Sequence, residues 1–441
     1  MSNNAQPFQE QTMAETVRDA VIIGGNRIPF ARAHGAYAKA SNQDMLTSAL
    51  NGLVARFGLQ GQQLGAVAGG AVMKHSKNFN LVRESVLGTP LDPKTPAYDV
   101  QMACATGTEA IGSLANKIKL GQIDSAIGGG VDSISDAPIV VTDELRSILM
   151  EANRAKTMGQ RLKALAKIRP GHLAPQAPDT GEPRTGLSMG EHMAVTAHQW
   201  EISRQEQDEL AVASHQNLAA AYDEGFFDDL VTPFKGLSRD NNMRADSSIE
   251  KLAKLSPVFG RDLGDAATMT AANSTPLTDG ASAVLLGSEE WADSHDLPKL
   301  ANFVDYEQGA VDFVDGAEGL LMAPAYAAAR MLKRNGLTFQ DFEYFEIHEA
   351  FASTVLAQMK AWESEEFCKN KLGLDAPLGS IDRSRLNVTG SSLAAGHPFA
   401  ATGGRIIAAL AKLLHGKPGK LGFISVCAAG GQGITAIIEG R

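Results

Sequence analysis

Short apolar runs alternate along the chain with longer stretches in which apolar residues recur every three or four positions. A strand buried on both faces carries a continuous apolar sequence, so the short runs predict buried strands. They cover residues 20–24, 125–131, 343–347, 421–426 and 434–438. Residues 105–119 repeat apolar side chains at helical spacing and predict a helix. This strand–helix alternation predicts an α/β fold with mostly parallel sheets and right-handed crossovers.

The same order of predicted elements occurs twice. Residues 97–133 predict a strand, a short loop, a helix of small residues and a strand rich in glycine, and residues 384–433 follow the same order. Cys104 and His397 occupy comparable places, each in a loop directly before a helix. Duplicated halves would put both loops at the carboxyl ends of strands, where α/β folds bind ligands. The repeat is loose, so a chance likeness between the two segments remains the alternative.

Residues 136–260 interrupt the alternation and predict an insertion in the first half. One helix inside it has a capping box at Ser203 and Glu206 and a stop signal at Gly225. Residues 145–170 contain a single acid, Glu151, and many cationic side chains: Arg146, Arg154, Lys156, Arg161, Lys163, Lys167 and Arg169. A basic amphipathic helix here would suit a membrane surface or an acidic partner, whereas a solvated surface helix fits the same pattern.

Composition narrows the class of protein. The chain has 441 residues, of which 44% are hydrophobic and 20% charged, as expected of a globular protein with two core-forming domains. A net charge of −10 argues against a nucleic-acid binder. No apolar run reaches the roughly 18 residues of a membrane span. Residues 1–18 lack an apolar signal core and predict a flexible tail. The three cysteines form no CxxC pair, which favours a reducing, cytoplasmic location.

Two of the candidate functional residues precede predicted helices. Small residues follow Cys104, and free N–H groups at a helix N-terminus would stabilise its thiolate and an oxygen developing negative charge nearby. Glycine before His397 and Pro398 after it fix the backbone, as a general base requires. The alternative interpretation of Cys104 is a buried core cysteine. The alternative interpretation of His397 is a histidine that only begins a helix.

Two further candidates lie at the ends of predicted strands. Cys427 runs into a stretch of small residues that leaves backbone N–H groups open to a ligand, although a tight hairpin explains the same glycines. His348 lies where a strand ends and a helix begins. Cys368 lies in a charged segment and receives no role. The triplet Gly128–Gly130 does not open a helix, so a nicotinamide site is a poor interpretation.

The combination and order of these motifs resemble the thiolase family. They are a cysteine near residue 100, HEAFA at His348, GHPFAATG at His397 and CAAGGQG at Cys427. Residues 270–280, TAANSTPLTDG, also resemble the thiolase loop that runs along the pantetheine of coenzyme A. The resemblance covers roughly residues 19–441.

The resemblance implies an α/β fold of two duplicated βαβαβαββ halves, arranged in five layers, α-β-α-β-α. The halves would cover residues 19–295, with an inserted loop domain at about 136–260, and residues 296–441. Most thiolases have Asn where this chain has His348, whereas the thiolase β subunits of fatty-acid-oxidation trifunctional complexes have His. The insertion from Met158 to Pro175 also resembles those subunits.

The resemblance also implies a 3-ketoacyl-CoA thiolase with the following roles. Cys104 is the acylated nucleophile, and His397 takes its proton. His397 and a water held by His348 bind the thioester oxygen. Cys427 is the second acid/base, and the backbone N–H groups of Cys104 and Ala429 form a second oxyanion hole. The residues implied to contact coenzyme A are Ser188, Met189, Ser274 and Thr275.

Such an enzyme needs no metal or redox cofactor, and coenzyme A is a substrate and product. The implied partners are a second copy of the chain, in a dimer or larger oligomer, and a hydratase/dehydrogenase subunit, with peripheral membrane contact through residues 145–175. A biosynthetic acetyl-CoA acetyltransferase is the nearer alternative, and a non-catalytic lipid-binding protein of the same fold is the more distant one. Departures from the family at Asp132, Pro276 and Ala429 leave all the catalytic side chains in place.

Overall fold

The computed structural model describes residues 17–176, 178, 181–315 and 318–441. Most of the predicted tail, residues 1–16, lies outside this part of the chain. Arg18, at the end of that range, is firmly held: its backbone N–H donates to the Lys119 carbonyl, and its guanidinium donates to the Ile118 carbonyl and to Asp124. The prediction of a flexible tail was wrong for this residue, because its donors satisfy carbonyls at the end of a helix.

The strands are β1 (Val21–Arg27), β2 (Ala31–Arg32), β3 (Ala66–Gly69), β4 (Ala97–Asp99), β5 (Ser125–Asp132), β6 (Thr278–Gly287), β7 (Ala301–Ala310), β8 (Phe342–Ile347), β9 (Leu421–Ala428) and β10 (Gln432–Gly440). The helices are α1 (Asn42–Arg56), α2 (Leu81–Leu87), α3 (Thr106–Lys119), α4 (Asp143–Arg154), α5 (Met158–Leu165), α6 (Met189–Gln199), α7 (Arg204–Asp223), α8 (Ile249–Leu252), α9 (Glu289–Ser294), α10 (Ala323–Asn335), α11 (Ala352–Glu363), α12 (Glu365–Asn370), α13 (Ser392–Ala395) and α14 (Thr402–Leu414). The five predicted strands and the helix predicted at residues 105–119 are all confirmed.

The sheet order shows that the two halves repeat one another. The strands run β4-β3-β5-β6-β1-β7-β10-β9-β8, which is nearly symmetric about the junction of β1 and β7. Only two residue pairs join β1 to β7, Val21 with Asn302 and Ile22 with Ala301. The missing counterpart of β4 is a single parallel bridge from Leu386 to Phe345 on β8. The duplication is therefore confirmed, with one strand of the second half reduced to a bridge.

The prediction of mostly parallel sheets was wrong. Among the described strands, β3–β4, β3–β5 and β8–β9 are parallel, whereas β1–β6, β1–β7, β2–β6, β5–β6, β7–β10 and β9–β10 are antiparallel. Each half ends in two strands that pair antiparallel, β5 with β6 and β9 with β10. The last strand of each half therefore inserts antiparallel between two neighbours.

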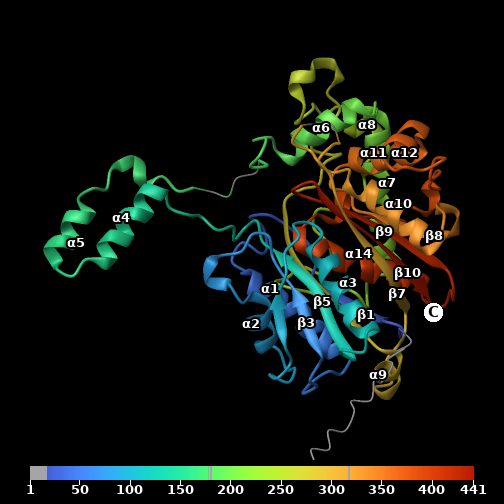
Figure 1. Cartoon of the computed structure of the whole chain (residues 1–441), viewed down its shortest axis with the longest axis horizontal. Coiled ribbons are helices and arrows are strands. Elements are labelled where there is room, and N and C mark those ends of the chain that lie inside the picture. Colours follow the sequence, from blue (N-terminus) through green and yellow to red (C-terminus); the bar gives the residue numbers. More distant parts are fainter. Residues whose placement is uncertain (1–16, 177, 179–180, 316–317) are drawn as a thin grey trace, which may run out of the picture.

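The core has the five layers that the family resemblance implies (Figure 1). Alternate residues of one strand point to opposite faces of a sheet. Thus Ile22 of β1 joins the central cluster with α3 and α14, while Val21 and Ile23 join the outer cluster with α1 and α2. On the other half, β9 places Ile424 in the central cluster and Phe423 in the outer cluster with α10 and α11. The helices α3 and α14 are therefore buried between the two halves of the sheet.

The insertion has two unlike parts. Helix α7 begins at the predicted capping box of Ser203 and Glu206, and Gly225 follows its end with φ +76°. This helix packs on the body through Ala211 and Val212. Helices α4 and α5 instead form a hairpin that stands away from the rest of the chain (Figure 1). The basic stretch thus folds as two helices rather than one. None of the described helices has the length and apolar character needed to cross a membrane.

Candidate active site

Cys104 lies on the turn that leads from β4 into α3. The preceding residue, Ala103, has φ +44°, which is uncommon for a residue with a side chain. The hydroxyl of Thr106 accepts from the backbone N–H of Met102 and donates to the carbonyl of Ala103, so the turn is fixed from inside. This turn places Cys104 at the N-terminal end of α3, as predicted, but two residues before the helix begins.

His397 lies between α13 and a short 3₁₀ turn, Phe399–Ala401, that leads into α14. Gly396 has φ +103°, and a Cβ there would lie 2.5 Å from Cγ2 of Thr278, so only glycine fits this turn. The backbone of His397 bridges to Leu277, and its Nδ1 lies 2.6 Å from Oγ1 of Thr402. The ring is therefore held at both its backbone and its Nδ1 edge.

Glycines allow α3 and α14 to touch backbone to backbone at the ends that carry these residues. A Cβ on Gly107 would lie 2.6 Å from the Ala400 carbonyl oxygen, and one on Gly403 would lie 2.3 Å from the backbone nitrogen of Thr108. Both distances are far shorter than van der Waals contact. The two helix N-termini, one from each half, therefore approach closely enough to bring Cys104 and His397 together.

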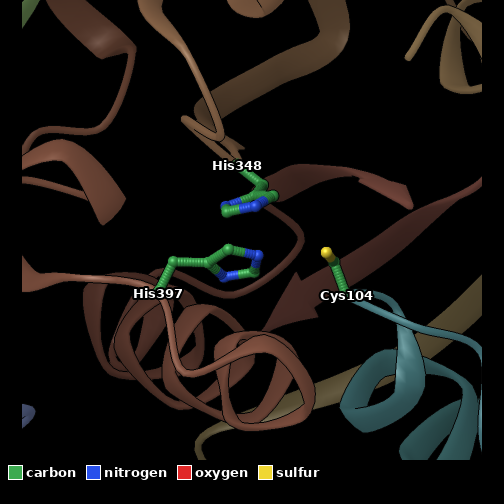
Figure 2. A group of neighbouring side chains, drawn as sticks. All are labelled: Cys104, His348 and His397. Carbon is green, nitrogen blue, oxygen red and sulfur yellow. The ribbon is translucent and has the colours of Figure 1, made fainter. Parts of the chain in front are cut away.

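His348 completes the cluster from the end of β8, where its backbone N–H donates to the Ser425 carbonyl at 2.8 Å. The centroids of the His348 and His397 rings are 4.1 Å apart. The Cys104 sulfur faces both rings (Figure 2), and Sγ and one nitrogen of each ring lie within 4.8 Å of one another. Because Nδ1 of each ring is bonded to a hydroxyl, Nε2 is the nitrogen left free, and both Nε2 atoms are buried with no partner among the described residues.

Cys427 lies on β9 opposite Gly433 of β10, and its side chain is buried. The two strands form the tight hairpin that the sequence left open as an alternative, with Gly430 and Gly431 at φ +79° and +69°. Burial raises the pKa of the Cys427 thiol, and the charge of Cys104 raises it further. The charge of a Cys104 thiolate would therefore act on the Cys427 thiol, although Cys427 is not one of the three residues whose ligand atoms lie within 4.8 Å of one another.

Burial determines the charge state of the cluster. It raises the pKa of Cys104 to about 12, although the backbone N–H of Ala429 opposes this rise. The prediction that the helix N-terminus would favour a thiolate was thus wrong in net direction, because desolvation outweighs the donors. Burial and then Arg405 lower the pKa of His397 to about 3. Burial and then the charges of His397 and Arg405 hold the pKa of His348 well below its usual range. The resting site therefore contains a neutral thiol and two neutral imidazoles.

Glu182, for which the sequence predicted no role, connects the insertion to the site. Its carboxylate accepts a hydrogen bond of 2.7 Å from the backbone N–H of Gly430, next to Ala429. Its side chain is buried, and its charge is among the causes that raise the pKa of Cys104. Glu182 therefore both positions the hairpin turn and opposes formation of the Cys104 thiolate. An acid between Gly181 and Pro183 carries no sequence signal for this role.

Substitution Glu182→Gln is expected to make Cys104 more reactive. Glutamine keeps an oxygen that can accept from Gly430, but it removes a negative charge that raises the thiol pKa. The pKa of Cys104 should fall, and alkylation by iodoacetamide at a fixed pH below that pKa should speed up a few-fold. The measurement is the rate of Cys104 alkylation against pH. An unchanged profile would show that the charge of Glu182 does not reach the thiol, and Glu191→Gln serves as an exposed control.

Other buried polar residues lie behind the cluster, and the sequence predicted no contacts for them. Arg405 on α14 donates to the hydroxyls of Ser391 and Ser392, and Ser392 lies 2.8 Å from Nδ1 of His348. Asp132, one of the departures from the family pattern, accepts from the backbone N–H groups of Val72, Met73 and Ala400. Burial raises the pKa of Asp132 to about 7. These contacts join segments far apart in the sequence, so no local pattern could have revealed them.

The residues implied to bind coenzyme A fall in two places. Thr275 bonds to the Ala350 carbonyl through its backbone N–H and its hydroxyl, and Ser274 bridges to Phe351. This loop therefore runs beside the segment that follows His348. Ser188 instead caps α6 through a capping box with Glu191, and Met189 begins that helix. Cys368 is buried on α12, with its sulfur near the Ala361 and Trp362 carbonyls, and lies outside the site.

A cysteine and two histidines at these distances are also ligand types that zinc binds. Both Nδ1 atoms are already bonded to hydroxyls, so any ion would compete for the same Sγ and Nε2 atoms that a nucleophile and its base need. The geometry alone therefore fits two kinds of chemistry.

Comparison with known proteins identifies the family to which the chain belongs. The description "Thiolase, N-terminal domain" matches residues 20–290, and "Thiolase, C-terminal domain" matches residues 297–440. The chain is 41% identical over 424 residues to a 3-ketoacyl-CoA thiolase of Pectobacterium atrosepticum, with 95% of this chain and 96% of that protein covered. It is 40% identical over 425 residues to one of Yersinia pestis, with 95% and 96% covered.

Solved structures agree with these matches. A human mitochondrial 3-ketoacyl-CoA thiolase superposes with a TM-score of 0.78 at 26% identity, with 97% of this chain and all of that chain covered. An acetyl-CoA acetyltransferase of Bacillus anthracis gives a TM-score of 0.78 at 28% identity with the same coverage. Fold, motif order and sequence identity over nearly the whole length lead to one conclusion: the chain belongs to the thiolase family.

Proposed function

We propose that this acyltransferase cleaves 3-ketoacyl-CoA with coenzyme A, giving acetyl-CoA and a shortened acyl-CoA, in fatty-acid β-oxidation. The observation that carries the proposal is the meeting of one thiol, Cys104, with two free imidazole Nε2 atoms beside a second buried thiol, Cys427. Relatives that share about two fifths of its residues are named 3-ketoacyl-CoA thiolase.

In the first half-reaction, Cys104 attacks the 3-keto carbon while Nε2 of His397 takes the thiol proton. The neutral state of both groups suits this step, because the proton can pass directly from sulfur to nitrogen without a buried charge at rest. The backbone N–H groups of Cys104 and Ala429 stabilise the oxyanion that forms on the attacked carbon. The carbon–carbon bond then breaks, and the electron pair moves to the acetyl-CoA enolate. His397 and His348 bind its oxygen, and Cys427 protonates its carbon.

In the second half-reaction, Cys427 takes the proton of incoming coenzyme A, whose sulfur attacks the acyl group on Cys104. The thiolate of Cys104 leaves and recovers a proton from His397. Every proton is returned and no electrons are exchanged with a carrier, so the residues need only coenzyme A as co-substrate. We assign the loop with Ser274 and Thr275, beside Ala350, and the start of α6 with Ser188 and Met189 to coenzyme A binding.

The direct test is a thiolysis panel. Purified protein is incubated with coenzyme A and 3-ketoacyl-CoA of short, medium and long chain, and acetyl-CoA release is followed. Release that requires coenzyme A supports the proposal, and the chain-length profile identifies the preferred substrate. No release at any chain length would refute it. A protein that condenses two acetyl-CoA molecules but cleaves only acetoacetyl-CoA would instead be the biosynthetic acetyltransferase.

Substitution Cys427→Ser is expected to slow both half-reactions. Serine is a far weaker acid, so protonation of the enolate and activation of coenzyme A should both slow, and turnover should fall roughly 10²- to 10⁴-fold. Steady-state thiolysis and single-turnover acylation are measured together. Cys368→Ala is the matched control, because that thiol is buried outside the site. Full turnover in Cys427→Ser would favour a condensing enzyme that uses one cysteine.

A non-catalytic lipid-binding protein of this fold makes a different prediction about covalent chemistry. It would bind acyl-CoA without forming an adduct. Intact-protein mass spectrometry after incubation with 3-ketoacyl-CoA, with no coenzyme A added, distinguishes the two. A mass increase by the shortened acyl group supports the enzyme, and unmodified protein with bound acyl-CoA supports the binding protein.

The α4–α5 hairpin is the surface that we assign to assembly. Two of its cations are neutralised by neighbours, Arg146 by Asp143 and Lys167 by Glu151. Leu162 is 60% exposed and Leu173, just beyond the hairpin, 62%, so apolar side chains accompany the remaining positive charge. This surface suits an acidic, partly apolar face. We propose that the hairpin binds a hydratase/dehydrogenase subunit in a cytoplasmic complex of the trifunctional type. This complex would be built on a homodimer or larger oligomer of the chain. We propose peripheral membrane contact as a second role of the same hairpin.

Co-purification with a candidate hydratase/dehydrogenase subunit and flotation with anionic vesicles test the two uses. The variant is Lys163→Glu with Arg169→Glu, and Lys94→Glu, at an exposed lysine outside the hairpin, is the control. Loss of one kind of binding in the hairpin variant alone identifies the partner. Homo-oligomers only, with no vesicle binding, would refute this assignment while leaving the catalytic proposal intact.

A further inference from the structure

A buried polar chain runs from the middle of α14 to the ring of His348. Nη2 of Arg405 donates to Oγ of Ser391 at 3.0 Å and to Oγ of Ser392 at 3.1 Å. Oγ of Ser392 lies 2.8 Å from Nδ1 of His348. Nε2 of the same ring is buried, without a partner among the described residues, in the cluster with Cys104. The chain thus starts at a fixed cation and ends at the reacting atoms.

The direction of each hydrogen bond follows from the donors and acceptors that the groups possess. A charged guanidinium can only donate, so Ser392 accepts from Arg405. The Ser392 hydroxyl then has one hydrogen left, and among the described residues Nδ1 of His348 is the acceptor that lies within hydrogen-bond distance of it. If Nδ1 carried the proton instead, that hydroxyl hydrogen would be buried without an acceptor, which costs about 1–3 kcal/mol. The positive charge of Arg405 also strengthens Ser392 as a donor.

The ring of His348 stays neutral, since burial and the nearby charges of His397 and Arg405 disfavour a second proton. A neutral imidazole with an acceptor at Nδ1 carries its hydrogen on Nε2. His397 needs the opposite tautomer to act as a base, and the hydroxyl of Thr402, 2.6 Å from Nδ1, can accept the Nδ1–H. The two rings, 4.1 Å apart, would then offer one donor and one acceptor to the site.

We propose that Arg405 and Ser392 are positioning residues that hold His348 in its Nε2–H tautomer, so that this ring is a permanent donor to the thioester oxygen, directly or through one water. The inference rests on the proposed function and goes beyond it, because it explains how a histidine serves where most thiolases have an asparagine. An asparagine amide always presents N–H groups. A histidine does so only if its tautomer is fixed.

The test is a double-mutant cycle between Ser392→Ala and His348→Asn, followed by single-turnover acylation of Cys104 and by steady-state kcat and KM. Removal of a whole oxyanion donor costs about 10²- to 10³-fold in rate, so partial loss of the tautomer in Ser392→Ala should slow acylation about tenfold with KM little changed. Ser392→Thr, which keeps the hydroxyl, should restore most of the rate. In the His348→Asn background, Ser392→Ala should cause no further loss, because the amide needs no tautomer.

Ser391→Ala is the matched control. Ser391 accepts from the same Nη2 of Arg405, but its hydroxyl makes no contact with His348 in the described structure. Its loss should therefore slow acylation much less than the loss of Ser392. An equal loss in Ser391→Ala, or an equal cost of Ser392→Ala with His348 and with Asn at that position, would show a purely structural role and overturn the proposal.

NMR spectroscopy of the histidine rings gives an independent measurement of the tautomer that needs no turnover. Enzyme labelled with ¹⁵N-histidine, assigned by comparison with His348→Asn, should show the wild-type ring with a protonated Nε2 and an unprotonated Nδ1. A protonated Nδ1 in the wild type would overturn the proposal even if the enzyme is active. Conversely, absence of any acyl adduct on wild-type Cys104 would refute the proposed function. The NMR spectrum would then be the measurement that tests the tautomer of His348.

Discussion

Replacement of Cys104 by alanine is expected to lower thiolysis by at least about 10⁴-fold, because loss of a nucleophile removes the covalent route entirely. Alanine is smaller than cysteine and should fit the turn after Ala103, and the polar groups around position 104 should stay as buried as in the wild type. The variant should therefore remain folded. The measurement combines the thiolysis rate with intact-protein mass after incubation with 3-ketoacyl-CoA. The acyl adduct should be absent from this variant.

The matched control for this variant is Cys368→Ala, which should keep both the adduct and most of the turnover. A second buried thiol, Cys427, remains in Cys104→Ala and could in principle become acylated. An adduct of undiminished amount in Cys104→Ala would place the acyl group on another residue and contradict the assignment of the nucleophile.

Replacement of His397 by asparagine is expected to slow acylation roughly 10³-fold near neutral pH, since a general base contributes about 10²- to 10⁴-fold. The size of the loss should depend on pH. The pKa of Cys104 is raised to about 12, so without a base the reactive thiolate becomes tenfold more abundant with each unit of rising pH. The rate of His397→Asn should therefore climb steadily with pH.

The wild type should behave differently, because burial lowers the pKa of His397 to about 3 and the base stays unprotonated above that value. Protonation of His397 should therefore cause no loss of acylation between pH 5 and 8. Acylation rates against pH for both proteins check this contrast, with His198→Asn on the exposed side of α6 as control. Parallel profiles for wild type and His397→Asn would contradict the role of base.

The parts of this structure that sequence could predict are those with a local pattern. Apolar runs revealed β1, β5, β8, β9 and β10, and the capping box at Ser203 revealed the start of α7. The order of motifs indicated the thiolase family and therefore a shared site for Cys104, His348 and His397. In the structure, Sγ of Cys104 and one nitrogen of each ring lie within 4.8 Å of one another. These features depend on neighbouring residues or on a fixed order along the chain, which is why one sequence suffices for them.

The parts that sequence could not predict depend on partners far apart in the chain. Strand direction was misjudged because each half ends in two strands that pair antiparallel, and pairing between distant strands leaves no trace in apolar spacing. The charge state of Cys104 was misjudged because desolvation, a property of the folded surroundings, outweighs the helix N-terminus. Ser392 and Arg405 lie 13 residues apart, and only the turn at Gly396 brings the serine back against α14.

The contact between α3 and α14 has a consequence for how the enzyme prepares for its reaction. The proposed nucleophile, Cys104, and the proposed base, His397, come from different halves of the chain. Their helices nevertheless meet at Gly107 and Gly403, where no side chain stands between the two backbones. Rotamer changes therefore cannot alter the spacing of the helix ends, and it is fixed once, when the halves fold together. The site is thus preorganised: the entropy lost in aligning sulfur and imidazole is spent during folding, so it does not slow each catalytic cycle.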